Sequence, residues 1–310
     1  MKIIMYHYIR ESLKQLPNFR YLHIENFKKQ LDFFEKEFGF VTYNDFLHLK
    51  ENPLFCNKLK NKILLTFDDG LKDHYNYVFN ELIKRKLFGI FFVPTRIFKQ
   101  KKVLDVHRIH YLLGKMGGGG ILLNTAYNII KPNMLKKSSL KLFKNYYQEL
   151  DDDKNTKDFK LLFNYFIKPE YKEKILDQIT INFWNDEEIF NDLYLNKNEL
   201  KTMSENGMLI ASHSSTHLSF KTLGIHNQKY ELQTSISFLN SFIKPSIQVF
   251  SYPYGESTSY AKRWLKKYNF DFAFSSIPSK DIEYKDLINN PFALHRYDCN
   301  EFIYGKANFG

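Results

Sequence analysis

Short apolar runs alternate with helical segments along this chain of 310 residues, and that alternation is the strongest constraint on its fold. Apolar spacing predicts helices over residues 24–38, 75–86, 196–206, 228–242 and 259–267. Between them, strands are predicted up to Tyr8 and at 40–42, 63–67, 90–93, 208–211 and 249–252. Strands joined by crossover helices run parallel. The pattern therefore predicts a parallel α/β barrel or sheet.

The predicted strand Ile63–Phe67 ends at two carboxylates, Asp68 and Asp69, followed by Gly70. A buried strand that stops there delivers both acids to the rim of the sheet, where loops carry chemistry. A cation can hold one carboxylate ionised while its neighbour stays free to move a proton. Asp-Asp-Gly is also an ordinary strand-ending turn, so the pair needs support from elsewhere in the chain.

That support comes from His213 and His217, which follow the predicted strand at 208–211. Their i, i+4 spacing lets both imidazoles face one ion. With Asp69 they would form a three-ligand site that leaves positions open for water and substrate. The same set could hold Fe²⁺ in an oxygenase, but Asp68 supplies a base, which hydrolysis needs and an oxygenase does not.

Three motifs in this order resemble those of the polysaccharide deacetylases, carbohydrate esterase family 4. They are Thr66-Phe67-Asp68-Asp69-Gly70, His213-Ser214-Ser215-Thr216-His217 and Phe250-Ser251-Tyr252-Pro253-Tyr254-Gly255. The opening residues 3–9 also resemble family members whose barrel begins with a Tyr-His strand. The resemblance implies an incomplete (β/α)7 TIM-like barrel with its site at the C-terminal rim of the strands.

Residues 1–98 and 196–310 are expected to form this barrel, with 99–195 as a mainly helical insertion. Helical spacing is clearest at 135–150, 159–167 and 171–181. Because the insertion separates two strands that face the rim, it is a candidate lid over the metal site. A stabilising helical embellishment is an equal alternative. His107 and His110 lie one helical turn apart within it, but no third ligand accompanies them, so no metal role is predicted.

The resemblance implies a hydrolase that depends on a divalent metal ion, with Zn²⁺ as the expected ion on Asp69, His213 and His217. Asp68 would take the proton as water attacks the amide. The backbone N–H of Tyr254 would then help to hold the oxyanion.

The proton donor to the departing amine is a C-terminal histidine in the family, and the candidate here is His295. The motif around His295 departs from the family pattern, which leaves His7 as an alternative. The third motif also departs, because Ser251 stands where the family often has an arginine. This variant resembles the branch that acts on exopolysaccharide and other surface glycans. Arg296 is expected to supply a guanidinium to Asp68 instead.

Composition limits the partners and the location. The net charge of +11 and the pI near 9.2 come from scattered lysines without a nucleic-acid motif, so no nucleic-acid partner is expected. Cys56 and Cys299 lie far apart in sequence, which favours a reducing compartment over a disulfide scaffold. No export signal is recognised and no apolar run approaches the roughly 20 residues that span a membrane. The expectation is a soluble cytoplasmic protein.

The predicted function is removal of N-acetyl groups from an amino sugar in surface polysaccharide or lipopolysaccharide biosynthesis. With the cytoplasmic location, the expected substrate is nucleotide-linked or lipid-linked. An amidase acting on a formylated sugar or a ring amide would use the same chemistry. A sugar-binding protein on a decayed deacetylase fold is the non-catalytic alternative, which Ser251 and the altered motif around His295 leave open.

Overall fold

The computed structural model describes residues 1–136, 147, 152–276 and 278–309. They form two compact units. The first comprises Met1–Glu11, Tyr21–Gln100 and Asn191–Ala307, and the second comprises Ser12–Arg20, Lys101–Phe190 and Asn308–Gly310. Ser12–Arg20, which the sequence analysis assigned to the barrel, thus lies in the second unit. Among the described residues, no helix is both long and apolar enough to cross a membrane.

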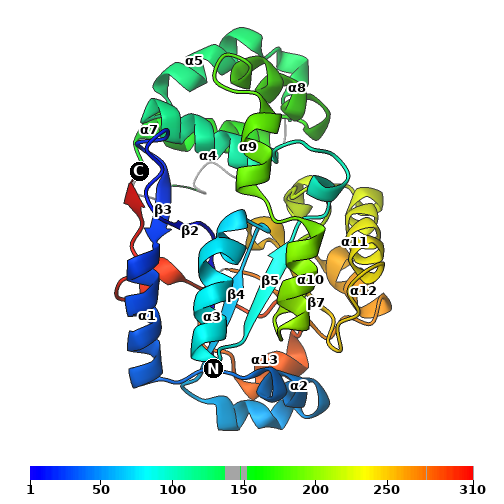
Figure 1. The fold of residues 1–310 in the computed structure, drawn as a ribbon. Coiled ribbons are helices and arrows are strands. Elements are labelled where there is room, and N and C mark those ends of the chain that lie inside the picture. The colour runs from blue at the N-terminus through cyan, green and yellow to red at the C-terminus, as the bar shows by residue number, and fades with distance from the viewer. Residues whose placement is uncertain (137–146, 148–151, 277, 310) are drawn as a thin grey trace. The chain divides into compact units, whose positions relative to one another are not determined.

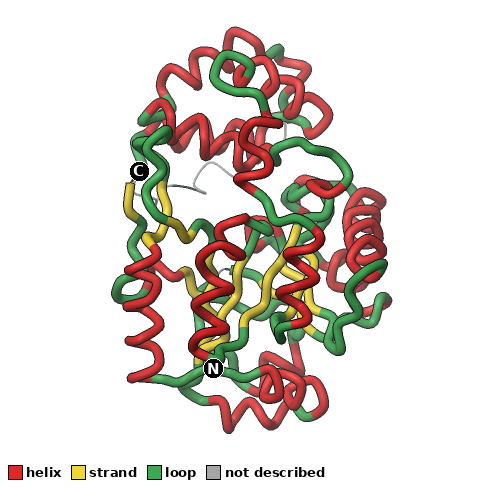
Figure 2. The backbone as a smooth tube through the Cα atoms, viewed as in Figure 1, coloured by secondary structure: helices red, strands yellow, loops and turns green. Residues whose placement is uncertain are grey.

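A parallel sheet of seven strands forms the centre of the first unit, with helices outside it (Figure 1 and Figure 2). The strands are β1 (Lys2–Tyr6), β4 (Ile63–Phe67), β5 (Gly89–Val93), β6 (Leu209–Ser212), β7 (Val249–Ser251), β8 (Phe272–Phe274) and β9 (Tyr297–Asp298). Their order is β8-β7-β6-β5-β4-β1-β9. This curled parallel sheet confirms the predicted incomplete (β/α)7 barrel.

The C-terminal segment that contains β9 contacts two strands that lie far apart in the order of the sheet, β8 and β1. Leu294 forms a parallel bridge with Phe274 of β8, and a few residues later Tyr297 pairs with Ile4 of β1. One short C-terminal segment therefore contacts both β8 and β1.

Alternate strand residues pack inside the barrel and form an apolar core. This core includes Ile3, Leu64, Ile90, Phe92, Leu209, Ala211, Val249, Phe272 and Phe274. Two helices, α2 (Tyr43–Glu51) and α13 (Tyr284–Asn289), contribute Phe46, Leu49 and Leu287 to the same core. Because successive strand side chains point to opposite faces, every second residue beyond these strands stays on the interior side. Asp68, two residues after Thr66, lies on that side.

The outer helices of the first unit mostly match the sequence expectations. They are α1 (Ile24–Glu37), α3 (Asn80–Arg85), α10 (Lys197–Glu205), α11 (Ile225–Asn240) and α12 (Ser259–Lys267). Helix α10 begins with a capping box, in which Asn196 and Glu199 exchange hydrogen bonds of 2.9 and 3.0 Å. Two short strands, β2 (Ile9–Arg10) and β3 (Arg20–His23), pair in parallel.

Two predicted elements differ in the structure. The strand expected at 40–42 is reduced to one bridge between Phe40 and Ile63, because the next helix begins there and Thr42 caps it in a box with Asp45. The helix expected at 75–86 begins as a π-helix, His74–Phe79, before it continues as α3. Apolar spacing predicts that a helix exists, but it does not resolve the wider turn.

The second unit is mainly helical and has its own apolar core. Among the described residues its helices are α4 (Asp105–Met116), α5 (Gly120–Ile129), α7 (Lys154–Leu161) and α8 (Pro169–Thr180), and α9 (Asp186–Leu193) begins in this unit and ends in the first. Ile109, Leu122, Phe159 and Leu176 belong to the core. Helix α7 continues as a π-helix, Leu162–Phe166. Most of the helix predicted at 135–150 lies outside the described residues, and β10 (Asn308–Phe309) ends the described chain.

Candidate metal and catalytic site

The first motif lies at the carboxyl end of β4. Both of its carboxylates are buried, with 2% of each residue exposed. Asp69 and Gly70 turn the chain sharply, with φ of 79° and 63°. A Cβ on Gly70 would lie 2.9 Å from Cγ1 of Val93, so the close approach to β5 requires glycine as well.

Asp69, His213 and His217 converge as predicted. Asp69 Oδ1 lies 3.4 Å from His213 Nε2 and 3.0 Å from His217 Nε2. One ligand atom from each residue lies within 4.8 Å of the others, and all three residues are buried. Among the described residues, no other group of three or more His, Cys, Asp or Glu side chains brings its ligand atoms this close together.

The three donor atoms fit a divalent ion such as Zn²⁺. Ligands about 2.0–2.1 Å from Zn²⁺ at tetrahedral corners lie roughly 3.3 Å apart, which is close to the separations seen here. His213 Nδ1 lies 2.8 Å from the carbonyl oxygen of Ser251. Since a carbonyl only accepts, Nδ1 carries the proton and Nε2 keeps its lone pair for the ion. Burial would lower the pKa of His213, but the carboxylates of Asp68 and Asp69 raise it, so this site attracts a cation.

Asp68 forms a buried bidentate pair with Arg296. Arg296 Nη1 donates to Asp68 Oδ1 over 2.8 Å, and Nη2 donates to Oδ2 over 2.7 Å. Ser251 stands beside the pair, with its hydroxyl 3.3 Å from Asp68 Oδ2 and 2.9 Å from Arg296 Nη2. The guanidinium thus reaches Asp68 from the residue after His295, as the sequence analysis expected of Arg296, and Ser251 contacts both partners.

This pairing keeps Asp68 ionised. Burial alone would raise the pKa of Asp68, but the guanidinium of Arg296 and the imidazole of His213 outweigh burial and lower that pKa to about 2. His213 Nε2 lies 3.8 Å from Asp68 Oδ2, so the ionised carboxylate stands next to the metal-ligand cluster. A carboxylate at this position can accept a proton from a molecule bound at the cluster.

The other predicted catalytic residues lie on the same rim. Tyr254 has a left-handed backbone, with φ of 59°, and its ring centroid lies 5.3 Å from that of His217. His295 is half-buried beside Arg296, and its Nδ1 lies 3.4 Å from the hydroxyl of Ser275. His7 follows β1, and its carbonyl lies 2.9 Å from Nε2 of the buried His74. The choice between His295 and His7 as proton donor stays a prediction.

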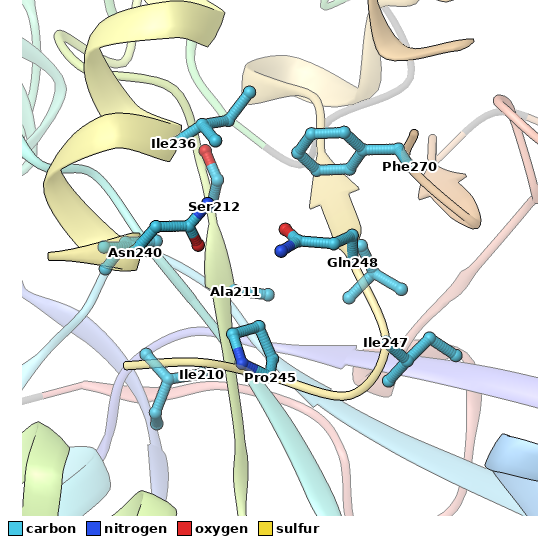
Figure 3. Close-up of a pocket in the computed structure, with 11 residues that line it drawn as sticks. Ile210, Ala211, Ser212, Ile236, Asn240, Pro245, Ile247, Gln248 and Phe270 are labelled. Carbon is cyan, nitrogen blue, oxygen red and sulfur yellow. The ribbon is translucent and has the colours of Figure 1, made fainter. Parts of the chain in front are cut away.

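A small cavity lies behind the strand that carries His213. It is bounded by Ser212 of β6, by Ile236 and Asn240 of α11, and by Gln248 and Phe270 (Figure 3). Its volume of about 10 Å³ is room for one water molecule at most. It includes none of the predicted site residues, so it is not the substrate site.

Residues 165–273 match the family model described as polysaccharide deacetylase. The matched range contains both histidine ligands and the whole Phe250–Gly255 motif. Over this range the chain is similar to the polysaccharide deacetylase family. The resemblance inferred from the three motifs is therefore confirmed, although the Asp68-Asp69 motif lies outside the matched range.

Several solved structures with low sequence identity share the fold. The deacetylase PplD of Streptococcus pyogenes, determined with acetate, has a TM-score of 0.56 at 15% identity, over 96% of this chain and 91% of that one. IcaB of Ammonifex degensii has a TM-score of 0.55 at 15% identity, over 96% and 90%. A de-N-acetylase of Aggregatibacter actinomycetemcomitans has a TM-score of 0.52 at 10% identity, over 96% and 93%. No curated protein sequence matches the chain significantly.

Two contacts of this candidate site were missed from the sequence. Thr66 lies 3.1 Å from Arg296 Nη1, and the carbonyl of Ser275 accepts from Arg296 Nε over 3.4 Å. Thr66 precedes Asp68 by two residues on the interior face, so strand alternation could have identified it.

His107 and His110 lie in α4 of the second unit, with ring centroids 6.3 Å apart. Neither belongs to the three-ligand cluster.

Proposed function

We propose that this deacetylase domain removes N-acetyl groups from an amino sugar by metal-dependent hydrolysis. The observation that carries the proposal is the ionised Asp68, which Arg296 holds beside the convergent donors of Asp69, His213 and His217. We further propose a nucleotide-linked or lipid-linked sugar of surface polysaccharide or lipopolysaccharide biosynthesis as the substrate. The likeness of the third motif to the surface-glycan branch supports that substrate class.

The residues divide the hydrolysis into proton transfers and charge stabilisation. A divalent ion on Asp69, His213 and His217 would lower the pKa of water and polarise the amide carbonyl. Asp68 takes a proton as the oxygen of that water bonds to the carbonyl carbon. The backbone N–H of Tyr254 donates to the oxyanion that develops on the carbonyl oxygen.

A proton donor completes the cleavage. When the C–N bond breaks, the bonding electrons remain with nitrogen, which takes a proton, and acetate is left on the other side. His295 is the proposed donor because it is the candidate for the C-terminal histidine that donates the proton in the family. His7, at the end of β1, is the second candidate.

Catalysis accounts for the site better than sugar binding alone. A binding protein has no need to keep a buried carboxylate ionised, since burying a charge costs free energy unless a partner compensates it. Here Arg296 supplies that compensation. A formylated sugar or a ring amide would require the same residues, so the substrate panel below includes both.

The test is acetate release from N-acetylated nucleotide sugars and short glycans, with the Zn²⁺-loaded wild type beside Asp68→Asn. A formylated sugar and a ring amide complete the panel. We expect release by the wild type and a loss of at least about 100-fold in Asp68→Asn, the lower range for removal of a general base. Formate release or ring opening would instead identify another amide. Bound sugar without any product from the wild type would contradict the proposal.

A further inference from the structure

The loop between the two histidine ligands has a backbone that requires external support. Within His213–His217, Ser214 has φ of 64° and His217 has φ of 59°. Residues with a Cβ rarely adopt this left-handed conformation, and it persists only where surrounding contacts hold it. The ligand His217 is therefore in a conformation that its own sequence does not favour.

Glu231 of α11 supplies contacts that hold this loop. Its Oε2 accepts from the backbone N–H groups of Ser215 and Thr216 over 2.9 and 2.8 Å. Its Oε1 accepts from the hydroxyl of Thr216 over 2.7 Å. Only 4% of Glu231 is exposed, so these hydrogen bonds to a carboxylate are shielded from water. Hydrogen bonds to a charged acceptor are about twice as strong as neutral ones.

Other contacts complete the loop but engage different groups. The backbone N–H groups of Thr95 and Arg96 donate to the carbonyls of Ser214 and Ser215 over 3.2 and 2.9 Å. The Ser214 hydroxyl accepts from the N–H of His217 over 3.1 Å. Glu231 is thus the contact that takes the N–H groups at the middle of the loop.

Helix α11 is fixed to the strand that carries the other histidine. The hydroxyl of Ser212, the residue before His213, donates to Ser235 of α11 over 2.7 Å. Ile236 and Asn240 extend from the same helix toward Ser212 (Figure 3). One helix therefore contacts both β6, which ends next to His213, and the loop that leads to His217.

We propose that Glu231 is a positioning residue for the metal: it holds the Ser214–Thr216 loop so that His213 and His217 present their Nε2 atoms to one ion. The inference rests on the proposed function, since it requires that the site binds a metal. Outer contacts of this kind commonly change metal affinity by about 10–100-fold when removed.

The test measures Zn²⁺ affinity by competition with a chromogenic chelator, with the fold of each apo protein checked by circular dichroism and urea unfolding. We expect Glu231→Ala to weaken Zn²⁺ binding by about 10–100-fold. Glu231→Gln should recover most of the affinity, because its oxygen can accept from both N–H groups while its amide donates to Thr216. Thr216→Val, which removes one contact of three, should show a smaller loss.

Gln228→Ala is the matched control. Gln228 lies one turn earlier in α11, is also 4% exposed, and donates to the carbonyls of Phe220 and Leu223 outside the loop. A folded Glu231→Ala with wild-type affinity would overturn the inference, and so would an equal loss in Gln228→Ala. If Glu231→Ala does not fold, Thr216→Val decides, and unchanged affinity overturns the inference. Failure of the wild type to bind Zn²⁺ would instead overturn the proposed function, and the inference with it.

Discussion

Arg296 is the residue on which the proposed base depends most directly. Its guanidinium reaches both oxygens of Asp68, with distances of 2.8 and 2.7 Å, and 1% of Arg296 is exposed. A lysine carries the same charge but cannot bridge two oxygens in this fork geometry. The orientation of Asp68, and not merely its ionisation, therefore depends on the arginine.

We expect Arg296→Lys to lower kcat by as much as about 100-fold, the effect of a small misplacement of a reacting group, with little change in KM. Acetate release under saturating sugar measures this loss. Arg108→Lys is the matched control, because Arg108 is 2% exposed and paired with Asp177 and Asp186 in the second unit. Wild-type turnover in a folded Arg296→Lys protein would show that Asp68 does not need a bidentate partner.

Residue types predicted part of this arrangement. Asp69, His213 and His217 could be grouped from the sequence because each follows a predicted strand, and parallel strands bring their carboxyl ends together. Glu231 was missed because it lies on a helix outside any motif. The helical spacing nevertheless gave an indication, because Glu231 falls on the buried face of α11 with Gln228, Leu232 and Ser235. A charged residue on a buried stripe indicates a specific partner.

At the scale of elements, the short turn Pro253–Gly255 of the third motif carries the backbone N–H of Tyr254, the proposed donor to the oxyanion. Gly255 has φ of 66°, and a Cβ there would lie 1.8 Å from the hydroxyl oxygen of Ser276 and 2.6 Å from its backbone nitrogen. An alanine cannot be accommodated by a side-chain rotation alone, because backbone atoms are in the way. The turn would have to move, and the N–H of Tyr254 with it.

Gly255→Ala should therefore lower kcat by about 100-fold, the cost measured when one oxyanion donor is lost. Steady-state acetate release measures the effect. Gly224→Ala is the control, since a Cβ there would meet no heavy atom within 4 Å and its φ is −67°. Equal activity in the two variants would argue against a role for this turn in catalysis.

Elements with a clear apolar period were predictable, and those set by competing contacts were not. Helix α12 has the predicted bounds, Ser259–Lys267, because its buried Ala261 and Leu265 repeat at helical spacing. The strand expected at 40–42 failed because Thr42 serves as a helix cap. The π-helix His74–Phe79 has helical spacing too, and its apolar pattern does not distinguish it from an α-helix.

For the whole molecule, His74 makes stability depend on pH. It is fully buried against Phe67 and Phe91, and burial lowers its pKa from 6.5 to about 4. Above pH 6.5 His74 is neutral in both the folded and the unfolded protein, so it does not change stability there. As pH falls below 6.5, the unfolded chain gains a proton that the folded protein excludes, so stability is lost until about pH 4.

Between pH 7.5 and 5, the wild type should lose about 2 kcal/mol more unfolding free energy than His74→Gln, as the difference in pKa requires. Urea unfolding across this range measures both curves. His226→Gln changes an exposed imidazole on α11 and should follow the wild type. Parallel curves for the wild type and His74→Gln would mean that His74 is protonated in the folded protein.

The C-terminal segment that connects β8 to β1 also determines when the site can exist. Asp68 and Arg296 are separated by 228 residues, and closing a loop of that length costs about 5 kcal/mol of chain entropy. During synthesis, Asp68 leaves the ribosome long before Arg296 has been translated. Until then the carboxylate has no guanidinium to compensate its burial, so the rim of the barrel must stay open to water. The proposed catalytic base is thus among the last parts of the molecule to be assembled.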